Sequence, residues 1–535
     1  MTTCAEAVAE TLKEAGVQTI FGLPGGEVLD LLEACRQQGI SFILTRHEAI
    51  AAFMAEVTGQ ITRRPGVCLS TLGPGAINLM LGVASAYLER SPLLAMSGQL
   101  SEEASPFCTH QRIDIPALFG PVTKWNTTLD GKDTRGRVQR AIELATQQRM
   151  GPVHLTLPAN VARQQDEEVN PRQTPSDRHA APLNESVLKE ALKALKQSTH
   201  PLILIGVNID PVHSAPIVNQ FVEKTRIPVM ATPKAKGVIS ESNPLYLATA
   251  GGMAGDRLVL EFLDKVDLLV GIGFDPVESD KMWHKDKKLL SIDTATTADG
   301  AYAPSLELIG DVDAILAAIL DSYSPAHAWQ ESELHEFKAS MVAALRPAVS
   351  ASPRGLSPFH VALRLRDVLS PGAILTTDVG AHKLLLGQVW QAYEPLTFFM
   401  SNGLSSMGYG LPAAMAAKLQ FPDRDVVSVC GDGGFLMVLQ DLETAVRLQL
   451  PVVCVVFCDR KLGLIEVVQK KRRYPSYGID FEGVDIARVA EAFGAYGVAI
   501  ETLNELEATV RDGLRRRTPV VIAVPIDPEE YAGQM

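Results

Sequence analysis

Short apolar runs alternate with helical patterns along most of the chain. In residues 1–160 the apolar runs are only a few residues long, and amphipathic segments separate them. Strands that alternate with helices are typical of α/β domains with a mostly parallel sheet. The pattern predicts strands of the first block at 19–21, 41–44, 67–71, 93–97 and 153–157.

Two polar stretches, 162–185 and 322–358, read as linkers and divide the chain into three blocks. We therefore expect three doubly wound α/β domains with mostly parallel sheets, and the length of 535 residues fits that number. The first and third blocks are similar in size and style, although no repeat between them is obvious. The expected domains are 1–165, 186–322 and 356–535.

The stretch 426–464 predicts one βαβ unit of the third block. An apolar run, 426–430, stops at a turn that begins with Gly431 and Asp432, a helical pattern follows, and a second apolar run leads to Asp459. Both strands of such a unit finish at the same edge of a parallel sheet, so the two aspartates can converge. Two carboxylates beside a glycine turn and a helix N-terminus suit a magnesium-bound diphosphate.

Composition narrows the possible partners. The net charge is −13 without a long run of like charge, which argues against nucleic acid or an anionic membrane surface. No apolar run approaches membrane-spanning length, and the N-terminus has the pattern of an amphipathic helix instead of a signal peptide. The seven cysteines are scattered and form no CxxC pair, so we expect free thiols in a reducing cytoplasm.

The GDG turn with Asp459 after the next strand resembles the thiamine-diphosphate motif of the 2-oxoacid decarboxylase and acetohydroxyacid synthase superfamily. The usual motif ends in two asparagines, whereas this chain has Cys458-Asp459, and the aspartate keeps a hard oxygen ligand. The resemblance implies that Mg²⁺ binds the side chains of Asp432 and Asp459 and the carbonyl of Lys461. Further stretches match in the family's order at 46–49 (RHEA), 71–78 (TLGPGAIN), 378–382 (DVGAH) and 401–412 (SNGLSSMGYGLP).

These matches imply roles for single residues. The superfamily glutamate at the position of Glu48 hydrogen-bonds N1′ of the cofactor's aminopyrimidine and promotes the imino tautomer that deprotonates the thiazolium C2. Met407 matches the bulky residue that wedges beneath the cofactor and bends it. The implied cofactor-binding residues are Pro24, Gly25, Glu48, Thr71, Pro74, Asn78, Val379, Gly380, His382, Gly403, Ser405, Met407, Gly431, Asp432, Gly433, Gly434, Asp459, Lys461, Leu462, Gly463 and Leu464.

Within the superfamily, residues 21–32 (FGLPGGEVLDLL) and 110–114 (HQRID) resemble FAD-independent, catabolic-type acetolactate synthases. Their glutamine near the reacting carbon corresponds to Gln111, which we therefore count with Glu48 as catalytic. The arginine-glycine pattern of flavin-binding relatives is not evident, so we predict no FAD. In this family the two halves of the cofactor site come from different chains, which implies a homodimer or homotetramer.

Two departures leave the product open. Glu27 stands where the subgroup tends to carry a lysine, and Val468 replaces a tryptophan of the anabolic synthases. The leading hypothesis is decarboxylation of a 2-oxoacid, with pyruvate favoured, and carboligation to a second carbonyl. The alternative is a decarboxylase or aldehyde lyase of the same superfamily that releases a free aldehyde.

A third hypothesis is a nucleotide-binding oxidoreductase that uses the middle block. There Gly271 and Gly273 follow an expected strand at 268–272, and Asp293 ends another expected strand. That order superficially resembles a dinucleotide fold. Pro276 stands in place of the third glycine, so a structural α/β domain is the better interpretation.

Overall fold

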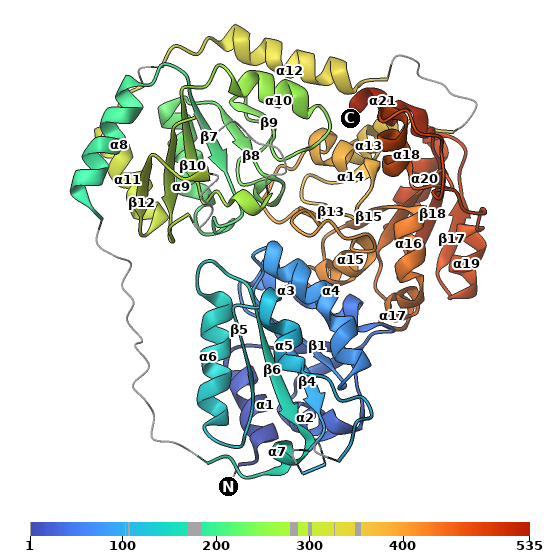
Figure 1. Ribbon diagram of the computed structural model, residues 1–535. Helices are drawn as coiled ribbons and strands as arrows, with labels where there is room; N and C mark the ends of the chain where they lie inside the picture. Colours follow the sequence, from blue (N-terminus) through green and yellow to red (C-terminus); the bar gives the residue numbers. More distant parts are fainter. Residues whose placement is uncertain are drawn as a thin grey trace.

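Three parallel sheets organise the molecule. The computed structural model describes residues 2–101, 103–104, 107–167, 183–278, 287–297, 302–325, 327–347 and 355–535. Each sheet has six strands, and every strand pair is parallel. Figure 1 shows the three sheets with their helices as three bodies of one chain. The predicted fold, three α/β domains with parallel sheets, is confirmed.

The first domain has the strand order β2-β1-β3-β4-β6-β5. Its first helix begins at Thr3, whose side chain forms a reciprocal capping box with Glu6. The strands are β1 (Thr19–Leu23), β2 (Ser41–Leu44), β3 (Gly66–Ser70), β4 (Leu93–Gln99), β5 (Trp125–Thr128) and β6 (Pro152–Pro158). The helices are α1 (Cys4–Glu14), α2 (Leu29–Gln37), α3 (Glu48–Thr62), α4 (Pro74–Leu88), α5 (Ile115–Phe119), α6 (Thr134–Thr146) and α7 (Ala159–Arg163).

The third domain repeats this topology. Its strand order is β14-β13-β15-β16-β18-β17, so both sheets read 2-1-3-4-6-5 when the strands of each domain are numbered along the chain. The strands are β13 (Ile374–Thr377), β14 (Phe398–Met400), β15 (Val426–Gly431), β16 (Val453–Cys458), β17 (Tyr496–Ala499) and β18 (Val520–Pro525). The helices are α13 (Pro358–Val368), α14 (Ala381–Val389), α15 (Gly410–Gln420), α16 (Asp432–Val438), α17 (Leu442–Arg447), α18 (Gly463–Lys471), α19 (Ile486–Ala492), α20 (Leu503–Gly513) and α21 (Tyr531–Gln534).

The central domain has a different order, β12-β11-β10-β7-β8-β9, which reads 6-5-4-1-2-3. This is the strand order of dinucleotide-binding folds. The strands are β7 (Pro201–Ile205), β8 (Val229–Ala231), β9 (Tyr246–Thr249), β10 (Leu268–Ile272), β11 (Leu289–Asp293) and β12 (Leu306–Ile309). The helices are α8 (Glu185–Gln197), α9 (Ala215–Thr225), α10 (Asp256–Leu263), α11 (Val312–Ser322) and α12 (Glu331–Leu345).

Two local predictions differ from the structure. The expected linker 322–358 contains α12, whose buried Leu334, Phe337, Met341 and Leu345 form one apolar face against the central core. Charged residues between them hide the helical period in the sequence. The single helix expected after the GDG turn is instead α16 and α17, joined by the 3₁₀ turn Leu439–Asp441.

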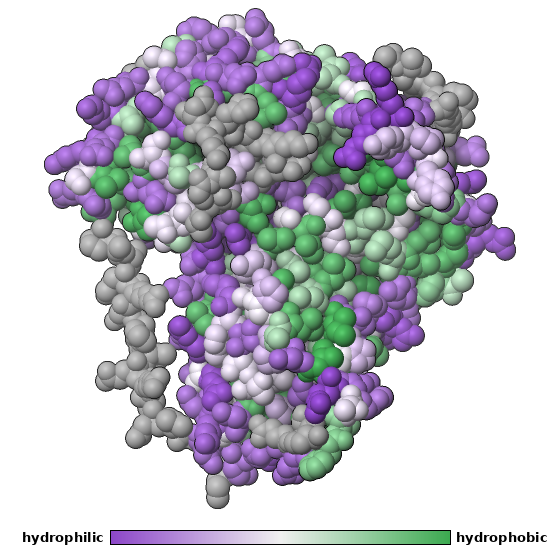
Figure 2. All heavy atoms as spheres, viewed as in Figure 1, coloured by the Kyte–Doolittle hydropathy of each residue, from purple (hydrophilic) through white to green (hydrophobic). Residues whose placement is uncertain are grey.

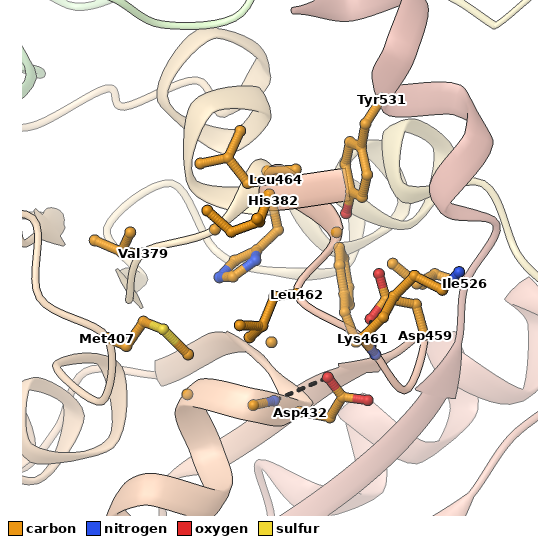
Figure 3. A pocket seen from close by; sticks show the side chains of 18 residues that line it. Val379, His382, Met407, Asp432, Asp459, Lys461, Leu462, Leu464, Ile526 and Tyr531 are labelled. Atoms are coloured by element: carbon orange, nitrogen blue, oxygen red, sulfur yellow. Dashed lines mark hydrogen bonds between the residues drawn. The ribbon is translucent and has the colours of Figure 1, made fainter. Parts of the chain in front are cut away.

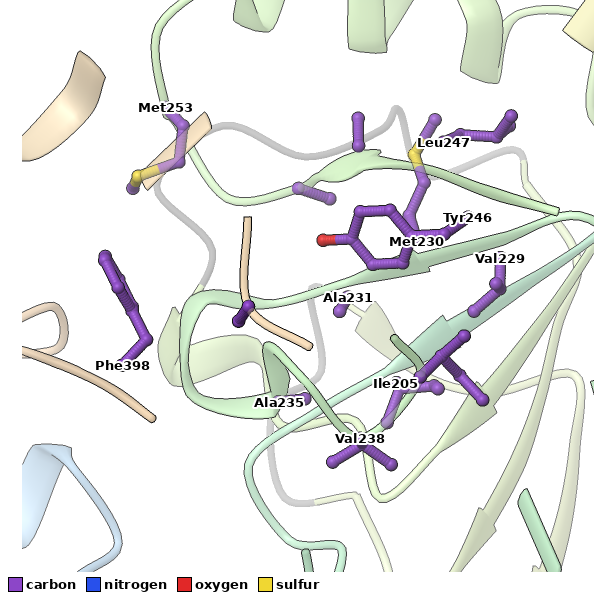
Figure 4. Close-up of a cluster of buried hydrophobic side chains, with 14 of the residues drawn as sticks. Ile205, Val229, Met230, Ala231, Ala235, Val238, Tyr246, Leu247, Met253 and Phe398 are labelled. Atoms are coloured by element: carbon purple, nitrogen blue, oxygen red, sulfur yellow. The ribbon is translucent and has the colours of Figure 1, made fainter. Parts of the chain in front are cut away.

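Shared apolar cores join the domains. One cluster contains α3 and α15, and there the rings of Phe53 and Tyr409 meet edge to face with centroids 5.5 Å apart. Another joins the central and third domains, and Figure 4 shows Phe398 of β14 and Met253 in this core. The described residues include no helix that is both long and apolar enough to cross a membrane. All seven cysteines are free thiols.

Candidate functional site

A cavity with about 600 Å³ of empty space, part of it open to solvent, lies at the carboxyl ends of β13, β15 and β16. The helices α14, α16 and α18 begin at its wall, because each follows one of these strand ends. Unpaired backbone N–H groups and the positive end of the helix dipole make a helix N-terminus favourable for anions. Three such termini around one cavity of ligand size suit a polyanionic group such as a diphosphate.

Asp432 is the first residue of α16 and is buried. Its Oδ1 accepts a hydrogen bond of 2.8 Å from the backbone N–H of Gly433, drawn as a dashed line in Figure 3. Its Oδ2 accepts a 2.8 Å hydrogen bond from the backbone N–H of Arg460, in the loop after β16. These bonds tie the two strand-end loops together, as the sequence predicted for a βαβ unit.

Asp459 is the second carboxylate of the cavity, with its Oδ1 3.3 Å from the backbone nitrogen of Lys461, which donates to it. Burial raises the pKa of Asp459 to about 7, and the nearby charge of Asp432 adds to the increase. Burial also raises the pKa of Asp432 above its usual range. A buried and a half-buried carboxylate that repel each other, beside a backbone carbonyl, fit the oxygen ligand set that Mg²⁺ prefers.

His382 lines another part of the cavity wall, and Asp378 lies behind it. The His382 Nε2 lies 2.9 Å from Asp378 Oδ1, and both residues are buried. The other oxygen of Asp378 accepts a 3.0 Å hydrogen bond from the backbone N–H of Gly408. Gly434 packs so closely that a Cβ there would lie 1.7 Å from Asp378 Oδ2. Asp378 therefore connects the β13 loop to the turn that follows Met407 and to the start of α16.

Most of the predicted third-domain residues line this one cavity: Val379, Gly380, His382, Met407, Gly431, Asp432, Gly433, Gly434, Asp459, Lys461, Leu462, Gly463 and Leu464. Met407 approaches the glycine turn, because its Cε would be 3.4 Å from a Cβ at Gly433. Gly403 and Ser405 are not among the lining residues. Ser405 instead accepts a 3.1 Å hydrogen bond from Lys383 Nζ.

The cavity also contains residues that sequence reasoning missed. They are Phe457, Ile465, Ile526 and Tyr531, while Ala381 lies within the matched stretch 378–382. Figure 3 shows the Tyr531 hydroxyl pointing into the cavity, and among the described residues this buried group has no hydrogen-bond partner. Burial and the charge of Asp459 raise the pKa of Tyr531 above its usual value. A neutral, unpaired donor beside the two aspartates fits a phosphate oxygen.

The first domain supplies a second group of predicted residues. Glu48 begins α3 after β2, as expected for a strand-to-helix turn, and only 4% of it is exposed. Its Oε2 accepts a 2.9 Å hydrogen bond from Asn78 Nδ2 on α4. The amide of Asn78 thus fixes the direction of a buried carboxylate at the start of α3.

The loop after β1 lies beside this group. Thr71 Oγ1 donates a 2.7 Å hydrogen bond to Glu27 Oε2, and a Cβ at Gly25 would lie 2.2 Å from the same Thr71 oxygen. Gln111 is exposed, with φ of +56°, and its Cβ would lie 3.0 Å from a Cβ at Gly73. The structure therefore brings Glu27, Gly25, Thr71 and Gln111 to one rim. Pro24, on the loop after β1, and Pro74, the first residue of α4, are exposed.

The two groups do not meet in one cavity of a single chain. Every residue that lines the third-domain cavity lies between Val379 and Tyr531, and Glu48 is not among them. Glu48 belongs to α3, the helix that packs against α15 of the same chain.

Comparison with known proteins identifies the family of all three domains. Family models of thiamine pyrophosphate enzymes match in order: the N-terminal TPP binding domain at residues 2–118, the central domain at 188–319 and the C-terminal TPP binding domain at 378–524. These matches confirm the predicted superfamily and its cofactor, thiamine diphosphate.

Similar proteins cover almost the whole chain. An acetolactate synthase of Bacillus subtilis (strain 168) is 33% identical over 98% of this chain and 93% of its own length. The catabolic acetolactate synthase of Raoultella terrigena is 30% identical over 98% of this chain and 95% of its own. The acetolactate synthase isozyme 2 large subunit of Escherichia coli (strain K12) is 29% identical with the same coverage. The chain thus belongs to the family of thiamine pyrophosphate enzymes, as a decarboxylase and carboligase similar to the acetolactate synthases.

Proposed function

We propose that the enzyme needs Mg²⁺ besides thiamine diphosphate, that it decarboxylates pyruvate, and that it joins the two-carbon unit to a second carbonyl. The observation that carries this proposal is the cavity in which three helix N-termini surround Asp432 and Asp459. Thiamine diphosphate, when bound, supplies the electron sink for the decarboxylation. The residues of this chain bind it, orient it and move protons.

In the third domain, Asp432, Asp459 and the carbonyl of Lys461 would hold the magnesium ion. The helix N-termini and the glycines at 380, 431, 433 and 434 would receive the diphosphate, because a glycine allows close approach of the backbone. Met407 lines the cavity beside Gly433 and would pack against the cofactor.

In the first domain, Glu48 would exchange a proton with N1′ of the aminopyrimidine, and Asn78 would hold the carboxylate in place. Pro24, Gly25, Thr71 and Pro74 would border the pyrimidine. Gln111 would lie near the acceptor. Gly403 and Ser405 would support the residues that contact the cofactor, since neither of the two lines the cavity itself.

A homodimer, or a tetramer built from two such dimers, would complete the site. Large apolar side chains are exposed beside both halves: Ile77 (52%) and Leu81 (42%) flank Asn78 on α4, and Met437 (55%) and Ile465 (46%) flank the third-domain cavity. In Figure 2, hydrophobic residues gather where the first and third domains meet. Exposed apolar patches of this kind are typical of protein interfaces.

Mixing two inactive variants tests the shared site. Glu48→Gln and Asp432→Ala each disable one half, so each homodimer should be inactive. After the two are unfolded and refolded together, half of the dimers are mixed, and each mixed dimer has one intact site. We expect about a quarter of wild-type activity from random pairing. An inactive mixture, with mixed dimers confirmed by mass, would contradict the proposal.

Glu27 favours a second candidate for the product. Its carboxylate accepts from Thr71 on the rim that also holds Gln111, and a negative charge there disfavours a second anionic 2-oxoacid. The second candidate is release of a free aldehyde. A screen of 2-oxoacids for carbon dioxide release, with product identification, separates the two: acetolactate from pyruvate supports carboligation, acetaldehyde the alternative, and no release refutes both.

We further propose that the enzyme binds no flavin and is cytoplasmic. In the central domain a cavity at the carboxyl ends of β7, β11 and β12 is lined by Asp210, which pairs with Arg63, and by Asp311 and Asp313, whose charges disfavour a nucleotide phosphate. A bound flavin would show as visible absorbance of the purified protein. The seven free thiols fit a reducing compartment.

A further inference from the structure

A buried cluster of charged residues lies where all three domains meet. Glu56 and Glu89 come from the first domain, Lys234 and Glu278 from the central domain, and Tyr409 from the third. Lys234 Nζ lies 2.9 Å from Glu89 Oε2 and 4.0 Å from Glu56 Oε1. The Tyr409 hydroxyl donates a 3.2 Å hydrogen bond to Glu56. None of these residues lines the cofactor cavity.

Glu89 connects this cluster to the third domain. It follows α4 directly, its side chain is fully buried, and its Oε1 accepts hydrogen bonds from the backbone N–H groups of Asn402 (2.5 Å) and Gly403 (2.7 Å). Its other oxygen meets Lys234. The carboxylate thus binds two domains at once, and the ammonium group of Lys234 compensates its buried charge.

The backbone that Glu89 holds belongs to the loop 401–408, which has no helix or strand of its own. Side chains fix this loop instead. Lys383 Nζ donates to Ser401 O (3.0 Å) and Ser405 Oγ (3.1 Å). Ser401 Oγ accepts from the backbone N–H of Ser406, the residue before Met407. Met407, whose side chain lines the cavity, therefore belongs to a loop whose backbone Glu89 holds at residues 402 and 403.

The central domain reaches the same loop a second time. Asn402 Nδ2 donates a 3.1 Å hydrogen bond to the backbone carbonyl of Glu278. Glu278 is anchored within its own domain, because its carboxylate accepts from the backbone N–H of Lys234 (3.0 Å) and of Val207 (3.0 Å). The central domain thus contacts the loop in two ways. Lys234 forms an ion pair with Glu89, which binds the loop, and the Glu278 carbonyl accepts a hydrogen bond from Asn402.

We propose that Glu89 is a positioning residue: paired with Lys234, it holds the 402–403 backbone and thereby sets the place of Met407 in the cofactor cavity. This inference rests on the proposed function of the cavity. It also gives the central domain a part in positioning the site, since Lys234 pairs with the carboxylate that holds the loop.

The test replaces Glu89 by alanine in the full-length enzyme. Hydrogen exchange, followed by mass spectrometry without substrate, should become about tenfold faster in the peptide that contains residues 402–407, because two amides lose their acceptor. The thiamine diphosphate concentration for half-saturation should rise about tenfold and kcat should fall about tenfold, at a temperature where the variant is folded. Glu89→Asp should restore part of each loss.

Arg90→Met is the matched control. Arg90 is the next residue in the chain, and its Nε forms a 2.8 Å ion pair with Asp275 of the central domain, so it also joins the first two domains. We expect loss of stability from this variant but unchanged loop exchange, half-saturation and kcat.

Two results would overturn the proposal. Unchanged exchange of the 402–407 peptide would show that Glu89 does not hold the loop, and faster exchange with wild-type kcat and half-saturation would show that holding it does not position the site. If Glu89→Ala does not fold, Lys234→Met carries the same measurements. A wild-type enzyme without thiamine-dependent activity would instead refute the proposed function, and the exchange result would still judge the loop contact.

Discussion

Asp432 and Asp459 directly follow the neighbouring strands β15 and β16, and their carboxylates lie close enough that the charge of Asp432 helps burial to raise the pKa of Asp459 to about 7. A hydrogen bond joins the loops that carry the two aspartates, because the backbone N–H of Arg460 donates to Asp432. A divalent cation between the two carboxylates would remove their repulsion and lower both pKa values.

Asp432→Asn is therefore expected to weaken magnesium-dependent cofactor binding by at least about 100-fold, because it removes one of two charged ligands. Titration of intrinsic fluorescence with thiamine diphosphate at fixed Mg²⁺ measures the loss. Asp423→Asn, an exposed aspartate of the same domain, is the control and should bind normally. Wild-type affinity in Asp432→Asn would refute the metal assignment.

Glu48→Gln should bind the cofactor within a few-fold of wild type but lose about 10²- to 10⁴-fold in kcat, because the amide cannot exchange the proton. Its hydrogen bond from Asn78 can persist, so the fold is expected to remain intact. Steady-state kinetics and the fluorescence titration measure the two effects. Glu33→Gln, an exposed change on α2, should alter neither, and near-normal turnover of Glu48→Gln would rule out the proton relay.

Tyr531→Phe is expected to act in opposite directions on the free and the loaded enzyme. The buried hydroxyl has no partner among the described residues, so its removal should leave the melting temperature of the cofactor-free protein equal or higher. Loss of a donor to the diphosphate should weaken cofactor binding by roughly fivefold to tenfold. Tyr496→Phe is the control, and a lower melting temperature with unchanged cofactor affinity would contradict this role.

The raised pKa of Glu56 predicts that the free energy of unfolding depends on pH. Burial raises its pKa to about 8, with Lys234 opposing and Glu89 reinforcing the shift. The folded state therefore binds one proton more than the unfolded state between about pH 4.5 and pH 8, and the free energy of unfolding falls across this window as pH rises, by up to about 1.4 kcal/mol per pH unit. Above about pH 8 the free energy of unfolding stops falling, and the folded state retains the full cost of burying the ionised Glu56 carboxylate.

Glu56→Gln stays neutral at every pH and removes this cost. The difference in melting temperature, Glu56→Gln minus wild type, should increase from pH 5 to pH 8 and then stay constant. Glu223→Gln, an exposed change on α9, should show a constant difference over the same series. A flat difference for Glu56→Gln would mean that Glu56 is ionised throughout.

Local patterns in the sequence predicted most strands of the first block and the βαβ unit with its two aspartates, while the family resemblance supplied most of the other residues that line the third-domain cavity. The apolar runs at 41–44 and 268–272 coincide with β2 and β10. The glycine turn and Asp459 needed only the rule that parallel strands end at one edge to be placed together. The resemblance then supplied Glu48 and Met407, which belong to short motifs.

Only the tertiary structure decided which distant residues meet. It revealed that the first and third sheets share one strand order, that Tyr531 enters the cavity, and that Glu89 holds residues 402 and 403. It also separated Glu48 from the cavity of its own chain. Such contacts join residues far apart in the sequence, and their geometry follows from how whole domains pack, which no local period or motif encodes.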